Sequence, residues 1–219
     1  MKSIGLEIEG FSRSRYQKSN SMFQCIISAL KAEAQPLADY YGLKQDHSYD
    51  YPFYGTDEMK IICTGIGRKN INDVLINFYE RLPKNTKAQF VNIGIAGGKK
   101  NECKIGECFI IDNVYDDRSK KVFNLNNKLK SYCSTQNITT VSNPISDGGL
   151  SYSTLVDMEA HEICRAVYKL GLNDNLLIIK IISDFMDVSN NDLSFKEVYD
   201  LVDKNLNNIN RLLTAFRNN

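Results

Sequence analysis

The chain has no tryptophan, two histidines and four prolines among its 219 residues. Its six cysteines form neither a CxxC pair nor a metal-ligand spacing, and the two histidines, His47 and His161, stand far apart without a motif around them. We therefore expect no metal and no cofactor, and we expect His161 to be a helix-surface or core residue. Several cysteines lie in apolar, strand-like runs, which favours reduced thiols in the cytoplasm.

The chain also lacks a long apolar run and a strong net charge. No run reaches the roughly 18–20 apolar residues that cross a bilayer, and residues 1–20 lack the apolar stretch of a secretory signal. With 27 basic and 26 acidic residues the net charge is +1, which gives no electrostatic attraction to nucleic acid or to a membrane surface. We therefore expect a cytoplasmic protein whose partner is a small molecule, not a nucleic acid or a membrane.

Strand-like and helix-like segments alternate along the chain. Strands are expected at 23–29, 60–63, 88–93, 107–114, 138–141 and 176–182, and helices at 31–41, 71–82, 158–170 and 194–216. The run 176–182 is almost unbroken Leu and Ile, typical of a strand that is covered on both faces. Residues 115–135 are polar and are expected on the surface. The length suits one domain, so we expect a polar N-terminal extension at 1–20 and a single domain at 21–219.

This alternation predicts an α/β fold of three layers, with helices on both faces of a mostly parallel sheet. Ligand sites in such folds lie at the carboxyl ends of the strands. Three acidic residues occupy suitable positions: Glu33 and Asp184 follow strands, and Glu159 lies between a loop and its helix. Each acid could instead be there because the helix dipole favours acids in the first turn. That explanation is weakest for Asp184, which ends a very apolar strand.

With the short motifs around them, these acids make the sequence resemble the 5'-methylthioadenosine/S-adenosylhomocysteine nucleosidases and the wider purine nucleoside phosphorylase family. The resemblance runs from about Phe23 to the C-terminus. Its motifs, in order, are ISALKAEA at 27–34, TGIG at 64–67, NIGIAGG at 92–98, IGE at 105–107, VDMEA at 156–160, ISD at 182–184 and LSF at 193–195. The first motif also resembles the hopanoid-associated phosphorylase-like branch. The resemblance implies a three-layer α/β/α fold with a twisted, mixed central sheet, and a homo-oligomer, such as a homodimer.

The resemblance also implies a role for each acid. N-glycosidic cleavage passes through a cationic ribosyl group and expels an electron-rich purine, so a positioned acid must protonate the base at N7. Asp184 matches that acid, Glu33 matches the glutamate that deprotonates the attacking water, and Glu159 matches the one that holds the ribose hydroxyls. The further substrate-binding residues are Met158 against the sugar, Ser183 beside Asp184, Ile95 and Gly97 on a glycine-rich turn, and Ile145 near the base.

The acceptor of the ribosyl group is judged from residues that are missing. A phosphate needs arginine and hydroxyl donors. Asn92 carries no charge where the bacterial phosphorylases place arginine, Ile95 stands where a hydroxyl is expected, and SAL at 28–30 replaces a glycine-rich phosphate turn. Arg68 could still bind phosphate, but we expect it to be a surface or subunit-contact residue. These residues favour hydrolysis of a purine nucleoside such as methylthioadenosine or S-adenosylhomocysteine.

Three other interpretations stay open at the level of sequence. The first is a phosphate-dependent purine nucleoside phosphorylase. The second is a protein that binds a nucleoside without cleaving it, because segment 141–156 is shorter than the base-covering region of the family and lacks its Ser-Gly-Asp; the presence of both an acid and a base disfavours it. The third is a dinucleotide-binding enzyme, suggested by Gly65-Ile66-Gly67, although the third glycine of that fingerprint would fall on Asn70.

Overall fold

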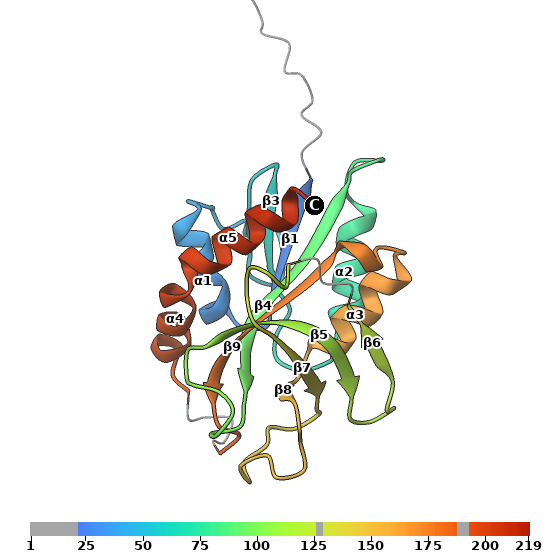
Figure 1. Cartoon of the computed structure of the whole chain (residues 1–219). Coiled ribbons are helices and arrows are strands. Elements are labelled where there is room, and N and C mark those ends of the chain that lie inside the picture. The colour runs from blue at the N-terminus through green and yellow to red at the C-terminus, as the bar shows by residue number, and fades with distance from the viewer. Residues whose placement is uncertain (1–21, 126–128, 188–192) are drawn as a thin grey trace, which may run out of the picture.

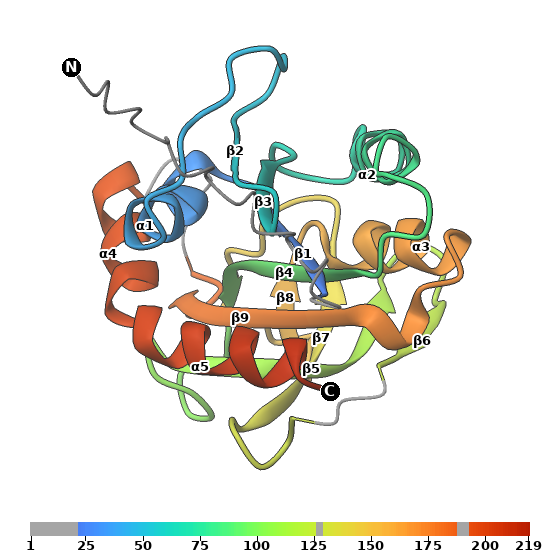
Figure 2. The same ribbon diagram turned by 90° about the horizontal axis from the view of Figure 1, so that it is seen from above.

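The computed structural model describes residues 22–125, 129–187 and 193–219. The expected N-terminal extension, 1–20, lies outside these residues. The described chain forms a mixed sheet with helices against both of its faces (Figure 1, Figure 2). The expected fold class, a three-layer α/β/α arrangement with a mixed central sheet, is therefore confirmed.

Helices and strands alternate over most of the described chain. The strands are β1 (Phe23–Ser28), β2 (Phe53–Gly55), β3 (Met59–Cys63), β4 (Ala88–Gly97), β5 (Cys108–Asp116), β6 (Val122–Asn124), β7 (Thr135–Thr140), β8 (Leu155–Asp157) and β9 (Leu176–Asp184). The helices are α1 (Lys31–Tyr40), α2 (Ile71–Glu80), α3 (Ala160–Lys169), α4 (Phe195–Lys204) and α5 (Leu206–Arg217), and a short 3-10 helix, Asn173–Asn175, precedes β9.

The strand order places several carboxyl ends at one edge of the sheet. The order is β2-β3-β1-β4-β8-β7-β5-β6, and β9 pairs with both β4 and β5. β1 is parallel to β3 and β4, and β4 is parallel to β9, whereas β9 is antiparallel to β5. Because β1, β3, β4 and β9 run in one direction, the residues that follow them come together, as a ligand site in this class of fold requires.

The helices cover the sheet in two groups. α1, α4 and α5 lie on one face, and α2 and α3 lie on the other (Figure 2). Strand β9 shows the consequence, because Ile179 and Ile181 belong to the core under the first group whereas Ile178 and Ile182 belong to the core under the second. The interpretation of 176–182 as a strand covered on both faces is thus confirmed. Its polar exception, Lys180, is also fully buried.

Four details differ from the expectations. β2 was not expected, and β6 lies within the segment 115–135 that was expected to be polar surface. The helix expected at 158–170 begins at Ala160, because the residues before it form β8 and pair with β7. The helix expected at 194–216 is two helices that meet at Asn205. The Asn205 side chain donates to the carbonyls of Leu201 (2.9 Å) and Gly106 (3.1 Å), so a side-chain amide bonds a carbonyl at the end of α4.

Candidate active site

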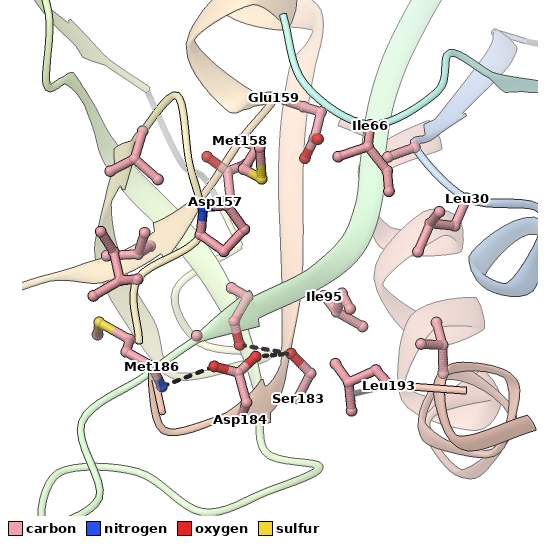
Figure 3. Close-up of a pocket in the computed structure, with 18 of the residues that line it drawn as sticks. Leu30, Ile66, Ile95, Asp157, Met158, Glu159, Ser183, Asp184, Met186 and Leu193 are labelled. Carbon is pink, nitrogen blue, oxygen red and sulfur yellow. Dashed lines mark hydrogen bonds between the residues drawn. The ribbon is translucent and has the colours of Figure 1, made fainter. Parts of the chain in front are cut away.

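A cavity of about 300 Å³ opens at the carboxyl ends of β1, β4 and β9. Its lining includes all eight residues proposed from the sequence, which are Glu33, Ile95, Gly97, Ile145, Met158, Glu159, Ser183 and Asp184. Figure 3 shows Glu159 and Met158 across the cavity from Ser183 and Asp184. Acids from three distant parts of the chain therefore line one cavity.

Glu33 lies in the first turn of α1 and is 2% exposed. Its Oε2 accepts hydrogen bonds from the backbone N–H groups of Ala29 (2.8 Å) and Leu30 (2.9 Å), and its Oε1 accepts one from Ile95 N–H (2.9 Å). Burial raises the pKa of Glu33 above its usual range, and these N–H groups and the charge of Lys180 offset that rise only in part. Glu33 thus caps the start of α1 and ties the helix to β4, and its raised pKa suits a group that must take up a proton.

Lys180 places a buried positive charge among the acids. It is 1% exposed, and its Nζ lies 2.8 Å from Oδ2 of Asp157. Burial alone would lower the pKa of Lys180, but the carboxylates of Asp157, Glu159 and Glu33 together raise it above its usual range. The ammonium is therefore charged, and it offsets part of the repulsion between the carboxylates.

Glu159 immediately precedes α3 and is 8% exposed. Its Oε1 accepts a hydrogen bond from the N–H of Gly67 at 2.6 Å. Burial and the charge of Asp157 raise the pKa of Glu159 to about 7, and Lys180 and the Gly67 N–H act in the opposite direction. The carboxylate points into the cavity (Figure 3). Glu159 therefore changes its charge near neutral pH at a position where it can meet a ligand.

Asp184 ends β9, and both of its carboxyl oxygens are held. The Ser183 hydroxyl donates to Oδ2 at 2.6 Å, and the Met186 N–H donates to Oδ1 at 2.8 Å (Figure 3). Met186 itself adopts a left-handed conformation with φ of 58°, which is uncommon for a residue other than glycine. The Ser183 oxygen also lies 3.3 Å from the carbonyl of Ala96. The orientation of the Asp184 carboxyl is thus fixed by the end of the strand.

Two glycines of β4 leave room for these charged groups. A Cβ at Gly94 would lie 3.0 Å from Oε1 of Glu33 and 3.5 Å from Nζ of Lys180. A Cβ at Gly97 would lie 3.0 Å from Oδ1 of Asp184. The glycine-rich end of β4 therefore lets the protein's own catalytic candidates approach the backbone, in addition to any ligand.

Apolar side chains form the two ends of the cavity. Met186, which bonds Asp184, packs in one cluster with Val141, Val156 and Ile145 at one end, and Leu30, Ile66 and Leu193 line the other (Figure 3). Ile66 is 58% exposed and lies at the opening. The cavity thus has a polar middle between two apolar ends, which suits a ligand with the same distribution of polarity.

Arg68, the one possible phosphate donor, and Asn92, which stands in the place of an arginine, both bond elsewhere in the chain. The Arg68 side chain is 11% exposed, and its guanidinium lies 2.6 Å from Oδ1 of Asp116 and donates to the carbonyl of Thr140 at 2.6 Å. Arg68 is therefore largely covered within the chain, unlike an exposed surface residue, and the other expected placement, at a subunit contact, stays a prediction. Asn92 is 2% exposed and donates to the carbonyl of Ile27 at 2.9 Å. Neither side chain lines the cavity.

Sequence analysis assigned no role to Lys180, Asp157 or Met186. A signal for Lys180 was present, because a lysine within a strand that is apolar on both faces must have a buried acidic partner. The partner, Asp157, lies two residues before Glu159 inside a motif already noted. No sequence pattern pointed to Met186, whose position depends on the backbone turn that follows Asp184.

His161 is a core residue, as one of its two expected placements states. It is 4% exposed, and its ring packs against Phe123 with ring centroids 4.9 Å apart. Over residues 22–125, 129–187 and 193–219, no group of three or more His, Cys, Asp or Glu side chains could hold a metal ion. The helices within these residues are all too short or too polar to span a bilayer.

Comparison with known proteins adds a result at the level of fold. No protein-family profile and no curated protein sequence matches the chain. Solved structures do match, among them the apo 5'-methylthioadenosine nucleosidase of Arabidopsis thaliana. It has a TM-score of 0.74 and 16% sequence identity, over 91% of this chain and 97% of that one. The chain has the fold of the 5'-methylthioadenosine/S-adenosylhomocysteine nucleosidases.

Two bacterial structures with the nucleosidase fold give the same result. The Campylobacter jejuni 5'-methylthioadenosine/S-adenosylhomocysteine nucleosidase has a TM-score of 0.69 at 14% identity, over 88% of this chain and 98% of that one. The Colwellia psychrerythraea nucleosidase in complex with adenine has a TM-score of 0.70 at 19% identity, over 90% of this chain and 96% of that one. The nucleosidase fold therefore extends over most of the chain.

Proposed function

We propose that the protein hydrolyses the N-glycosidic bond of a purine nucleoside, with water as the acceptor. The observation that carries this proposal is the convergence of Glu33, Glu159 and Asp184 on one cavity, beside a buried lysine. The nucleosidase fold supports it. Mere binding of a nucleoside would require neither a general acid nor a general base, whereas hydrolysis requires both on opposite sides of the reacting bond.

Asp184 acts on the base in this proposal. It donates a proton to N7 of the purine while the bond between the sugar C1' and N9 breaks, so that the base leaves as a neutral molecule. The Ser183 hydroxyl can turn and accept a hydrogen bond, with the carbonyl of Ala96 as its own acceptor at 3.3 Å. Ser183 can therefore orient the Asp184 carboxyl either as a hydrogen-bond donor or as an acceptor.

Glu33 acts on the water. It takes a proton from the water as the water oxygen forms a bond to C1', and it later releases that proton to solvent. The negative charges of Glu33 and Glu159 stabilise the cationic ribosyl group between the two steps. The three backbone N–H groups that bind Glu33 keep its carboxylate in one orientation, so little reorganisation is needed during the reaction.

Glu159 holds the sugar in this proposal. One of its oxygens is bonded to Gly67 N–H, and the carboxylate faces the cavity, where it can accept hydrogen bonds from ribose hydroxyls. Met158 lies beside it in the lining and supplies an apolar surface for the sugar ring. Since the ionised form of Glu159 is the better acceptor, we expect the nucleoside to bind more tightly as the pH rises through about 7.

Water is favoured over phosphate because the backbone N–H groups that could bind an anion already bind Glu33. The N–H groups of Ala29, Leu30 and Ile95 lie where an anion could be held, and each is already bonded to Glu33 at 2.8–2.9 Å. A phosphate dianion would have to displace that carboxylate and would meet the charge of Glu159 as well. Arg68, which could have offset the repulsion, is paired with Asp116.

The apolar ends of the cavity indicate the kind of nucleoside. The end beside Asp184 accommodates the flat purine, and the end lined by Leu30, Ile66 and Leu193 accommodates an apolar 5' substituent. A methylthio group gains from burial there, whereas a 5' hydroxyl would lose its hydrogen bonds to water. We therefore propose methylthioadenosine as a better substrate than adenosine or inosine.

The homodimer implied by the resemblance remains a prediction. Ile66 in the cavity lining and Phe195 at the start of α4 are 58% and 54% exposed, and a second copy would remove such apolar side chains from water. Light scattering at several protein concentrations tests it: a dimeric mass that persists on dilution supports it, and a monomeric mass contradicts it.

The activity is tested by offering methylthioadenosine, S-adenosylhomocysteine, adenosine and inosine with and without phosphate, and measuring the free base. We expect release without phosphate, fastest for methylthioadenosine, and its loss in Asp184→Asn. Asp174→Asn, an exposed acid on the 3-10 helix, is the matched control and should leave release unchanged. Release only with phosphate indicates a phosphorylase, and tight binding without release indicates a nucleoside-binding protein.

A further inference from the structure

The geometry points to Arg68 as a positioning residue for the Glu159 carboxylate. Arg68 binds the turn that follows β3 to Thr140, and Thr140 also binds the start of α3. Arg68 thereby holds the Gly67 N–H next to Glu159. The inference deepens the proposed function, since it assigns a residue that shapes the sugar site without contacting the substrate.

Arg68 is held by acceptors in two directions. Its guanidinium donates to the carbonyl of Thr140 at 2.6 Å and lies 2.6 Å from Oδ1 of Asp116. Oε1 of Glu162 lies 3.7 Å away, and Glu162 also pairs with Arg165 at 2.7 Å. A guanidinium held from two directions on a largely buried side chain has one orientation, because its planar fork matches both acceptors.

The turn that follows β3 makes few other contacts. Gly65 and Gly67 have φ of 81° and 83°, and a Cβ built on either would meet no atom within 4 Å. Lys69 and Asn70, which lead into α2, are exposed. The beginning of the turn is bonded to the end of β1, through Gly65 N–H to the carbonyl of Ala29 at 3.0 Å. Between Gly65 and Ile71, which is buried in the core, the turn is therefore held by the bonds of Gly67 to Glu159 and of Arg68 to Thr140 and Asp116.

Thr140 also holds Glu159, which is the acceptor of the Gly67–Glu159 hydrogen bond. Thr140 is fully buried, and its Oγ1 donates to Oδ1 of Asp157 at 2.7 Å and accepts the N–H of His161 at 2.9 Å. These two contacts hold the segment that carries Glu159. Both sides of the hydrogen bond at 2.6 Å are thus fastened to Thr140, one through its carbonyl and Arg68, the other through its hydroxyl.

Charge supports the same role. Burial by itself would raise the pKa of Asp116, but hydrogen bonds from Ser119 and Arg68 outweigh it and hold that pKa well below its usual range. The Arg68–Asp116 pair therefore stays ionised at every pH at which Glu159 titrates. The charged groups that face Glu159 are Asp157, Lys180 and Glu33. Arg68 acts on Glu159 through the Gly67 N–H, whose loss removes an interaction that lowers the Glu159 pKa.

The experiment follows the backbone amide of Gly67 by ¹H–¹⁵N NMR as the pH is varied, in the full chain without substrate. In the unchanged protein we expect this amide to titrate with a midpoint near pH 7, the pKa of Glu159. Glu159→Gln should abolish that titration and so assign it. In Arg68→Met we expect a smaller titration with a higher midpoint, and a KM for methylthioadenosine raised on the order of tenfold with a smaller change in kcat.

Two further variants make the result specific. Arg165→Met removes another arginine from the same ionic cluster, one whose side chain is 49% exposed; the Gly67 titration and the KM should stay unchanged. Arg68→Lys keeps the charge beside Asp116 but lacks the two-pronged geometry, so it should give an intermediate midpoint, and it replaces Arg68→Met if that variant fails to fold.

An unchanged Gly67 titration in a folded Arg68 variant would overturn the positioning role. The amide titration requires no turnover, so it decides the role of Arg68 even if the protein releases no base. Conversely, an active nucleosidase whose Gly67 amide ignores Arg68 would retain the proposed function and lose this inference alone.

Discussion

The two sides of the cavity differ in how they are built. On the side proposed to hold the water and the sugar, Glu33 and Glu159 accept bonds from backbone N–H groups and face the buried charge of Lys180. On the side proposed to hold the base, Asp184 is held by Ser183 and the Met186 N–H, and the lining next to it is apolar. The first side brings buried charges together, which lowers the stability of the fold. On the second side, ligand binding depends on the packing of apolar side chains. Substitutions on the two sides should therefore fail in different ways, and the predictions below, from the largest effect to the smallest, test that difference.

Asp184→Asn should give the largest loss of activity. The amide keeps the shape of the carboxyl but cannot donate a proton to the base as an acid does, so kcat should fall by about 10²–10⁴. Binding of the free base should change little, because the apolar walls beside Asp184 remain. Single-turnover release of base and calorimetric binding measure the two effects. A variant with unchanged kcat would contradict the role of Asp184.

Lys180→Met should mainly lower stability. Removing the lysine leaves Asp157 buried without its partner, which costs about 3–5 kcal/mol. Lys196→Met is the matched control, since Lys196 pairs with Asp200 at 2.7 Å while 81% exposed, against 2.8 Å and 2% for the Lys180 side chain paired with Asp157. The control should cost less than about 1 kcal/mol. Urea unfolding measures both, and similar losses would show that the buried charge is unimportant.

Glu159→Gln should weaken substrate binding yet stabilise the fold above pH 7. The Glu159 carboxyl has its usual pKa of 4.5 in the unfolded chain and a pKa of about 7 in the folded one. Glu159 therefore lowers the stability of the fold, by an amount that grows as the pH rises from 4.5 to 7 and is constant at higher pH. The penalty at pH 8 is on the order of 3 kcal/mol. At pH 4 both states are protonated and the variant should gain nothing. A gain that does not depend on pH would contradict this origin.

Gly149→Ala should give the smallest change in activity, a raised KM that originates on the base side. A Cβ at Gly149 would clash with Sδ of Met186, which is 1% exposed and lines the cavity, so the methionine must shift. Gly148 also has a positive φ but no atom within 4 Å, so Gly148→Ala costs only the backbone term of about 1–2 kcal/mol. Gly149→Ala should cost about 1–3 kcal/mol more and raise the KM.

Met186→Ala in the same chain tests the cause of that extra cost. The double variant should return to the KM of the unchanged protein, because Met186→Ala removes the side chain that the new methyl group displaces. A KM that stays high in the double variant would show that the loop at 145–152 acts by another route.

Much of this arrangement could be predicted from the sequence. Asp184 and β9 were identifiable because an acid that ends an unbroken apolar strand lies at a strand's carboxyl end, where ligands bind. Glu33 was identifiable in the same way after β1. Both inferences use local patterns and the general geometry of parallel sheets.

The remaining features depend on contacts between distant segments. The pairing of Lys180 with Asp157 joins β9 to β8, a three-residue strand too short to leave a pattern. Arg68 was expected at the surface or at a subunit contact, and only the fold brings Asp116 and Thr140 to it. The break between α4 and α5 likewise follows from one asparagine side chain that reaches Gly106.

The central claim, hydrolysis by water, is tested most directly by following isotopic oxygen. Methylthioadenosine is incubated with the protein in ¹⁸O-labelled water and excess phosphate, and the sugar product is identified by mass spectrometry. The account predicts free methylthioribose with one ¹⁸O at C1 and no sugar phosphate. Methylthioribose 1-phosphate as the product would contradict it, because phosphate would then have displaced the water that Glu33 is placed to activate.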